Sequence, residues 1–214
     1  MLLVLCRHGD TFEPGEVPVW VGSRNDLPLA RNGKVQADKT GEALRRSGVE
    51  FPRLICAPLK RTSEYAAIIA SALALQTPLV DSGLTEIDYG GWSGLSSEQL
   101  AARYGKPMLE AWEERGQFPP PGIWGETESQ VIQRIQQFIS RFRGGRNDEG
   151  NAVAVTSNGI LRLLCANLLT GSKPAGKEMK VRTGHSCIIE ISDAGVVARG
   201  WNLAPADLTR ALRE

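Results

Sequence analysis

The chain has 214 residues, of which 42% are hydrophobic and 23% charged, and its 25 basic residues nearly balance its 24 acidic ones. This composition is typical of a globular protein and excludes disorder as the dominant state. A formal net charge of +1 lacks the basic excess that nucleic acids and anionic lipids select. We therefore expect no nucleic-acid partner, and at this length we expect a single domain over residues 1–214.

The chain begins with a short apolar run, residues 1–6, which Arg7 closes. This run is too short for a signal-peptide core or a membrane span, so we expect no membrane partner and a cytoplasmic location. The four cysteines form no C-x-x-C pair, and His8 and His185 are the two histidines of the sequence. A zinc site of the usual spacing needs closely spaced Cys and His ligands, which two histidines and scattered cysteines do not supply. We therefore expect neither a metal nor a cofactor.

Short apolar runs rich in Val, Ile and Leu predict five strands, at residues 2–6, 53–56, 152–156, 186–191 and 196–201. Helical spacing predicts helices at 33–46, 59–73, 127–143 and 161–169. Strands that alternate with helices favour an α/β fold with a mostly parallel sheet. The turn between the last two strands is of hairpin size, so one edge of the sheet should be antiparallel.

Two local signals mark further helix starts. Ser96 is followed by Gln99 and Thr127 by Gln130, and both pairs fit the capping-box pattern. A Pro- and Gly-rich stretch at 117–125 lies between them, and the strand pattern resumes only after it. We interpret residues 95–126 as an insertion or lid, with Trp112 and Trp124 among its apolar residues.

The most informative motif is Arg7-His8-Gly9, directly after the first predicted strand. Ligands of α/β proteins bind at the carboxyl ends of the strands, so this motif predicts a site there. The imidazole of His8 is a candidate nucleophile, and the guanidinium of Arg7 can hold two oxygens of a phosphoryl group.

Two later segments offer partners for His8. Arg61 lies in the first turn of the helix that follows the second predicted strand, where a cation favours an anionic ligand. Glu86 precedes a glycine-rich stretch and is a candidate proton donor to a leaving oxygen. Asp88 lies two residues further on, and it is the alternative acid if the segment is extended.

Together these motifs resemble the histidine phosphatase superfamily, the phosphoglycerate mutase-like proteins, over nearly the whole chain. The resemblance rests on five separated motifs in the same order: Arg7-His8-Gly9 with Thr11, residues 22–29 with Gly33 and residues 36–37, residues 57–62, residues 84–86 with 91–94, and residues 125–127. It implies a three-layer α/β/α sandwich and a phosphohistidine mechanism.

Carried over to this chain, the resemblance gives His8 the role of nucleophile and Glu86 that of proton donor and then acceptor. It implies that Arg7 and Arg61 cradle the phosphoryl oxygens. Ser23 and Arg24 stand where the family often contacts substrate. These expected roles agree with the chemistry of the residues, because phosphoryl transfer needs mainly positioning and neutralisation of charge.

Two positions depart from the family pattern. Asn158 replaces the second family histidine after the third predicted strand, and we expect its amide to donate a hydrogen bond to the phosphoryl group without carrying charge. Pro14 replaces an asparagine that many members use at the phosphate. His185 stands in a loop that the resemblance places near the pocket, but nothing in the sequence fixes its direction, so we leave it out of the catalytic set.

We therefore expect a phosphomonoester phosphatase that acts on a small phosphorylated metabolite through a phosphohistidine on His8. Two alternatives stay open. One is a mutase-type phosphotransferase of the phosphoglycerate mutase kind, although the modest length of the interval 94–125 favours hydrolysis. The other is a catalytically weak or inactive phosphate-binding member, which the presence of Asn158 and Pro14 suggests and the retention of His8 and Glu86 argues against. A homodimer is also left open by the sequence.

Overall fold

The computed structural model describes residues 1–143 and 150–214. A six-stranded sheet runs through its middle in the order β3-β2-β4-β1-β5-β6. Its strands are β1 (Leu2–Arg7), β2 (Arg53–Cys56), β3 (Leu79–Val80), β4 (Ala152–Thr156), β5 (Ser186–Ser192) and β6 (Gly195–Leu203). The first four are mutually parallel, whereas β5 runs antiparallel to both β1 and β6. The predicted sheet with one antiparallel edge is confirmed.

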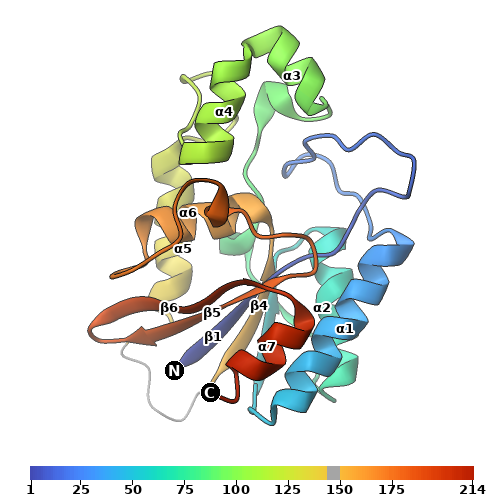
Figure 1. Cartoon of the computed structure of the whole chain (residues 1–214), viewed down its shortest axis with the longest axis vertical. Helices are drawn as coiled ribbons and strands as arrows, with labels where there is room; N and C mark the ends of the chain where they lie inside the picture. The colour runs from blue at the N-terminus through green and yellow to red at the C-terminus, as the bar shows by residue number, and fades with distance from the viewer. Residues whose placement is uncertain (144–149) are drawn as a thin grey trace.

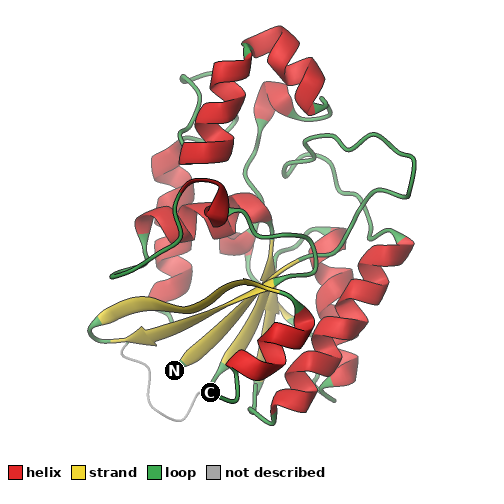
Figure 2. Cartoon of the chain, viewed as in Figure 1, coloured by secondary structure: helices red, strands yellow, loops and turns green. Residues whose placement is uncertain are grey.

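Helices cover both faces of the sheet (Figures 1 and 2). They are α1 (Arg31–Ser47), α2 (Lys60–Ala72), α3 (Ser97–Tyr104), α4 (Lys106–Arg115), α5 (Glu128–Ser140), α6 (Asn158–Asn167) and α7 (Pro205–Ala211). Helices α1, α2 and α7 pack on one face, while α5 and α6 pack on the other. Helices α3 and α4 extend beyond the second face. The three-layer α/β/α arrangement expected from the sequence is confirmed.

The alternation of side chains along β1 explains why the sheet has a core on each face. Leu3 and Leu5 pack into the cluster shared with α5 and α6, whereas Val4 and Cys6 pack into the cluster shared with α1 and α2. All four side chains are fully buried, because β1 lies between β4 and β5. A strand buried on both faces reads as a continuous apolar run, which is what residues 2–6 show.

Most predicted elements match, and the differences have local causes. Both capping boxes are present, at Ser96 with Gln99 and at Thr127 with Gln130. Helix α4 was not predicted, and Gly105, with a φ of 88°, separates it from α3. Strand β3 and helix α7 were also missed, because one has two exposed residues and the other only seven residues in all. Helix α6 begins at Asn158, three residues before the predicted start.

None of the helices in the described part of the chain is long and apolar enough to cross a membrane.

Candidate active site

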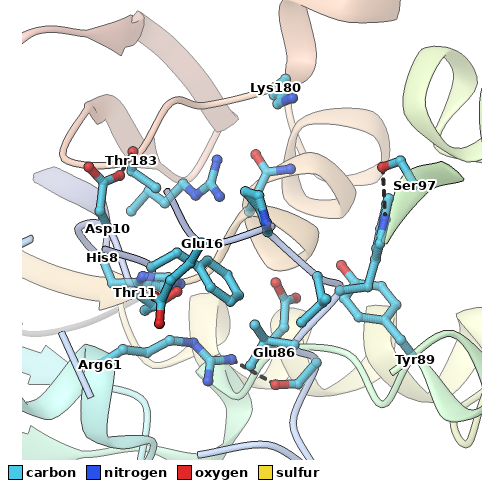
Figure 3. A pocket seen from close by; sticks show the side chains of 18 of the residues that line it. His8, Asp10, Thr11, Glu16, Arg61, Glu86, Tyr89, Ser97, Lys180 and Thr183 are labelled. Carbon is cyan, nitrogen blue, oxygen red and sulfur yellow. Dashed lines mark hydrogen bonds between the residues drawn. The ribbon is translucent and has the colours of Figure 1, made fainter. Parts of the chain in front are cut away.

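A cavity of about 800 Å³ opens where the parallel strands end, and five of the predicted site residues line it (Figure 3). Arg7 and His8 come from the end of β1 and Arg61 from the first turn of α2. Asn158 is the first residue of α6, directly after β4, and Glu86 lies in the segment after the short turn at Ser82–Leu84. Because β2, β4 and β1 are neighbours in the sheet, their carboxyl ends bring these side chains together.

His8 is buried and held in one ring orientation. Its Nδ1 atom lies 2.8 Å from the carbonyl oxygen of Gly9. A carbonyl oxygen only accepts, so Nδ1 carries the proton and the lone pair is left on Nε2. Burial, together with the positive charges of Arg61 and Arg7, holds the pKa of His8 well below its usual value of 6.5. His8 is therefore a neutral imidazole with a nucleophilic nitrogen available at neutral pH.

Two arginines supply positive charge beside His8. The guanidinium of Arg61, which is only 1% exposed, donates to the carbonyl oxygens of Asn25 at 3.0 Å and Gly22 at 2.8 Å. Arg7 donates from Nη1 to the carbonyl oxygen of Val181 at 2.6 Å. Burial lowers the pKa of both arginines, and nearby Glu86 counteracts that shift. These backbone carbonyls hold the guanidinium groups of Arg7 and Arg61 in position, so the positive charges are in place before a ligand binds.

Glu86 is also buried and lines the same cavity as His8. Its carboxylate accepts the main-chain N–H of Ile87 at 2.9 Å and that of Gly159 at 3.3 Å. Gly159 must lack a side chain, because a Cβ there would lie 2.4 Å from Oε1 of Glu86 and 2.6 Å from the hydroxyl of Tyr89. These contacts place the Tyr89 hydroxyl within about 5 Å of the Glu86 carboxylate, at the wall of the cavity.

Asn158 presents its amide in a defined way. Its Oδ1 atom accepts the main-chain N–H of Val181 at 3.0 Å, so the amide NH₂ group is the end left for the cavity that Asn158 lines. Helix α6 also directs its amino-terminal end at this point, which favours negative charge. Asn158 therefore lies at the wall of the same cavity as Arg7 and Arg61.

The other candidates lie elsewhere. Ser23 and Arg24 are not part of the cavity wall, which runs instead through the neighbouring Gly22. Arg24 has a side chain 60% exposed and pairs with Asp88 at 2.7 Å. The same ion pair takes Asp88 away from the cavity, so Asp88 is not placed to replace Glu86. The ring of His185 binds the carbonyl oxygen of Asn202 through Nδ1 at 2.9 Å and lies outside the cavity wall.

The predicted lid contributes less to the cavity than its apolar residues suggested. From residues 95–126, only Ser97, Trp112 and Glu113 line the wall. Trp124 is 7% exposed and its ring lies 4.8 Å from that of Tyr89, so it fills the core. The interpretation of Trp124 as a lid residue is wrong, because an indole surrounded by other rings buries more apolar area there than at the cavity.

A second set of cavity residues was not predicted from the sequence, apart from Thr11 and Pro14, which the family resemblance singles out. Residues 11–22 form much of one wall although they contain no helix or strand, and Pro14 is one of them. Tyr89, Arg162 and Lys180 also line the cavity, and Figure 3 shows Lys180 on the side away from Arg61. Arg162 could have been predicted, because it lies four positions after Asn158 and therefore on the same face of one helix.

Among residues 1–143 and 150–214, no group of three or more His, Cys, Asp and Glu side chains is arranged to hold a metal ion. Positively charged side chains at the cavity wall are Arg7, Arg61, Arg162 and Lys180.

Comparison with known proteins places this geometry in a family. The model of the histidine phosphatase superfamily (branch 1) matches residues 3–204. A 2,3-bisphosphoglycerate-dependent phosphoglycerate mutase of Parvibaculum lavamentivorans is 28% identical over 92% of this chain and 94% of its own length. A protein of the same name from Methylobacterium sp. strain 4-46 is 33% identical over 74% of this chain and 75% of its own length.

Solved structures agree with the fold. The alpha-ribazole phosphatase of Shigella flexneri superposes with a TM-score of 0.70 at 25% identity, covering 95% of this chain and 97% of that one. A mycobacterial glucosyl-3-phosphoglycerate phosphatase superposes with a TM-score of 0.75 over 95% of this chain and 99% of that one. Its identity of 24% supports the shared fold alone.

Proposed function

Because the chain belongs to the histidine phosphatase superfamily, we propose that it is a phosphomonoester phosphatase that works through a phosphohistidine on His8. The observation that carries the proposal is the hydrogen bond from Nδ1 of His8 to the carbonyl oxygen of Gly9. It leaves the lone pair on Nε2, in a cavity whose wall also holds Arg7 and Arg61.

In the first step, Nε2 of His8 attacks phosphorus as the bond between phosphorus and the ester oxygen breaks. Glu86 gives a proton to the departing alkoxide, so the alcohol leaves neutral. Arg7, Arg61 and the amide of Asn158 hold the phosphoryl oxygens, where the negative charge is spread. In the second step, water gives a proton to Glu86 and attacks phosphorus, which releases inorganic phosphate and restores His8.

The proposed substrate is a small phosphorylated metabolite. The cavity, at about 800 Å³, has room for an organic group beyond the phosphoryl group, and its wall there includes Trp20 and Trp112. We give no binding role to Ser23 or Arg24. We propose one domain over residues 1–214, with 95–126 as an insertion above one side of the cavity. A cytoplasmic location stays a prediction, which cell fractionation tests, and the open question of a homodimer is decided by sedimentation.

A mutase is the second candidate, because the curated relatives carry that name and match this chain over most of its length. A mutase must shield its phosphohistidine from water while the substrate turns over. Residues 95–126 supply only three side chains to the cavity wall, which favours transfer to water. Incubation with 3-phosphoglycerate and 2,3-bisphosphoglycerate distinguishes the two: a phosphatase releases inorganic phosphate, whereas a mutase produces 2-phosphoglycerate.

The nucleophile is tested by trapping. Brief incubation with a ³²P-labelled phosphomonoester and a quench without acid should leave acid-labile phosphate on His8, and His8→Ala should abolish both label and turnover. Label on another residue, or full turnover in His8→Ala, would contradict the mechanism. Chelator should leave turnover unchanged, since arginines supply the charge. A wild type that binds phosphate but hydrolyses no ester would support the phosphate-binding alternative.

A further inference from the structure

Glu86 lies in a part of the chain that has no regular backbone hydrogen bonding. It stands between two short 3-10 turns, Ser82–Leu84 and Gly90–Trp92, in a segment without helix or strand. Its own carboxylate bonds only to main-chain N–H groups. Because this segment has no helical or sheet hydrogen-bond pattern, the position of a side chain on it depends on the groups that bind the backbone on either side.

Arg134 of α5 holds the backbone before Glu86. Its Nη1 atom donates to the carbonyl oxygen of Gly83 at 2.9 Å and to that of Thr85 at 2.6 Å. The other two nitrogens face Glu126, with Nε 3.1 Å from Oε1 and Nη2 3.3 Å from Oε2. All three guanidinium nitrogens are therefore occupied, and two of the bonds form a fork on one carboxylate.

Glu126 holds the backbone after Glu86. Its Oε2 atom accepts the main-chain N–H of Asp88 at 2.9 Å. One ion pair thus fixes two carbonyls on the amino-terminal side of Glu86 and one N–H group on its carboxyl-terminal side. The pair is shielded from solvent, with side chains 18% exposed for Arg134 and 26% for Glu126. Neither residue lines the cavity, so neither can touch a substrate there.

We propose that Arg134 and Glu126 are positioning residues for the proton donor Glu86. The proposal rests on the function given above, in which Glu86 protonates the leaving oxygen. The ion pair sets how far the Glu86 carboxylate reaches into the cavity, while His8, Arg7 and Arg61 are held by other elements. Loss of the pair therefore harms proton transfer more than attack on phosphorus, and a shift of about 1 Å is enough to cost on the order of 10²-fold in rate.

This division has a measurable signature. An alkyl phosphate needs a proton on its leaving oxygen, whereas an aryl phosphate with an acidic phenol leaves almost unaided. We expect Arg134→Ala to lower kcat/KM for an alkyl phosphate by about 10- to 100-fold and kcat/KM for p-nitrophenyl phosphate by less than about 3-fold, because kcat/KM reports transfer to His8 and not the hydrolysis step that both substrates share. Glu126→Gln keeps an oxygen for the Asp88 N–H but loses the charge, so it should shift the ratio in the same direction by a smaller factor.

Three controls make the result decisive. Arg199→Ala removes another ion pair, with Glu190 of β5, far from this segment in the chain, and should leave the alkyl-to-aryl ratio at the wild-type value. Arg134→Lys keeps the charge but cannot reach all four acceptors, so it should recover part of the lost ratio and covers the case in which Arg134→Ala does not fold. Glu86→Gln reports what complete loss of the proton donor does to the ratio.

The outcomes separate the two proposals. If Glu86→Gln lowers the ratio but folded Arg134 and Glu126 variants keep the wild-type ratio, the positioning role is overturned and the function stands. Equal losses on alkyl and aryl substrates in the Arg134 and Glu126 variants would also overturn it, because they would indicate general damage. If Glu86→Gln leaves the ratio unchanged, Glu86 is not the acid and the positioning role falls with it, whereas the phosphatase function is still decided by the trapping of phosphate on His8.

Discussion

The Oδ1 atom of Asn158 accepts the main-chain N–H of Val181 at 3.0 Å, and this bond decides which end of the amide faces the cavity. The chain therefore keeps a hydrogen-bond donor where the family has a second histidine, although it gives up the charge. Val181 directly follows Lys180, which lines the cavity wall. A single side chain thus joins the start of α6 to the segment that contains Lys180.

Asn158→His should increase turnover by up to about 10²-fold. The Nδ1 atom of a neutral imidazole can accept the Val181 N–H as Oδ1 does now, which leaves Nε2–H as a donor to the phosphoryl oxygens. If the ring gives up the Val181 bond, Nδ1 can take a proton and the imidazole becomes cationic. Asn158→Asp is the matched control, because it keeps the acceptor but directs negative charge at the phosphoryl oxygens, and kcat should fall. Steady-state kinetics on one ester checks both, and a rise in Asn158→Asp would contradict the assigned orientation.

The lowered pKa of His8 should make the folded state sensitive to acid. Below the unfolded value of about 6.5, the unfolded chain takes up a proton at His8 that the buried imidazole of the folded chain refuses. Stability is therefore lost as pH falls below about 6.5, by up to about 1.4 kcal/mol per pH unit. Urea unfolding at pH 7.5 and 5.5 should show a larger drop for the wild type than for His8→Gln. Equal drops would mean that the pKa of His8 is not lowered in the folded state.

Gly159→Ala should displace Glu86 without touching Arg7 or Arg61. The added Cβ would lie 2.4 Å from Oε1 of Glu86, so the carboxylate must move. We expect kcat for an alkyl phosphate to fall by about 10- to 100-fold. In a Glu86→Ala background, the same change should cost little more, because the side chain that it pushes is gone. Additive losses in this double-mutant cycle would place the damage elsewhere.

Trp124 and Trp20 should differ in what their removal costs. Trp124 is buried among aromatic rings, with ring centroids 4.9 Å from Trp112 and 4.7 Å from Phe118. Trp124→Ala should lower the free energy of unfolding by about 3–5 kcal/mol. Trp20 is only partly buried at the cavity wall, so Trp20→Ala should cost less stability and raise KM for a bulky ester. Chemical denaturation and initial-rate kinetics measure the two effects.

The sequence predicted the parts of the fold that local pattern controls. The limits of β2 and β4 match the apolar runs at 53–56 and 152–156, because strands buried on both faces leave an uninterrupted apolar signal. Helix α4 escaped detection because it continues almost directly from α3, and only the positive φ of Gly105 marks the break. Strand β3 needs just two residues once β2 offers its edge, so tertiary pairing decides it.

At the site, the five residues that the motifs singled out, His8, Arg7, Arg61, Glu86 and Asn158, line one cavity, and their roles stay predictions. The direction in which a side chain points was harder to predict. Arg24 was expected to face a substrate, yet Asp88, more than sixty positions later in the chain, binds it on the outside. The wall at residues 11–22 has no periodicity, so its contribution to the cavity depends on contacts that only the folded chain forms. One such contact is the bond of the Trp20 indole to Ser97 at 3.3 Å.

The pairing of β1 with β4 has a consequence for when the site comes into existence. Leu3 pairs with Ala152 and Arg7 with Thr156, so His8 and Asn158 become neighbours only when two strands about 150 residues apart in the chain have joined. Helices α1 and α2 can form from nearby residues long before that, whereas closure of so long a loop is slow. During synthesis, a nascent chain that already holds His8, Arg61 and Glu86 is still without phosphatase chemistry. Recovery of turnover on refolding therefore reports the pairing of β1 with β4. The helical signal in circular dichroism should recover earlier, because α1 and α2 can form before that pairing.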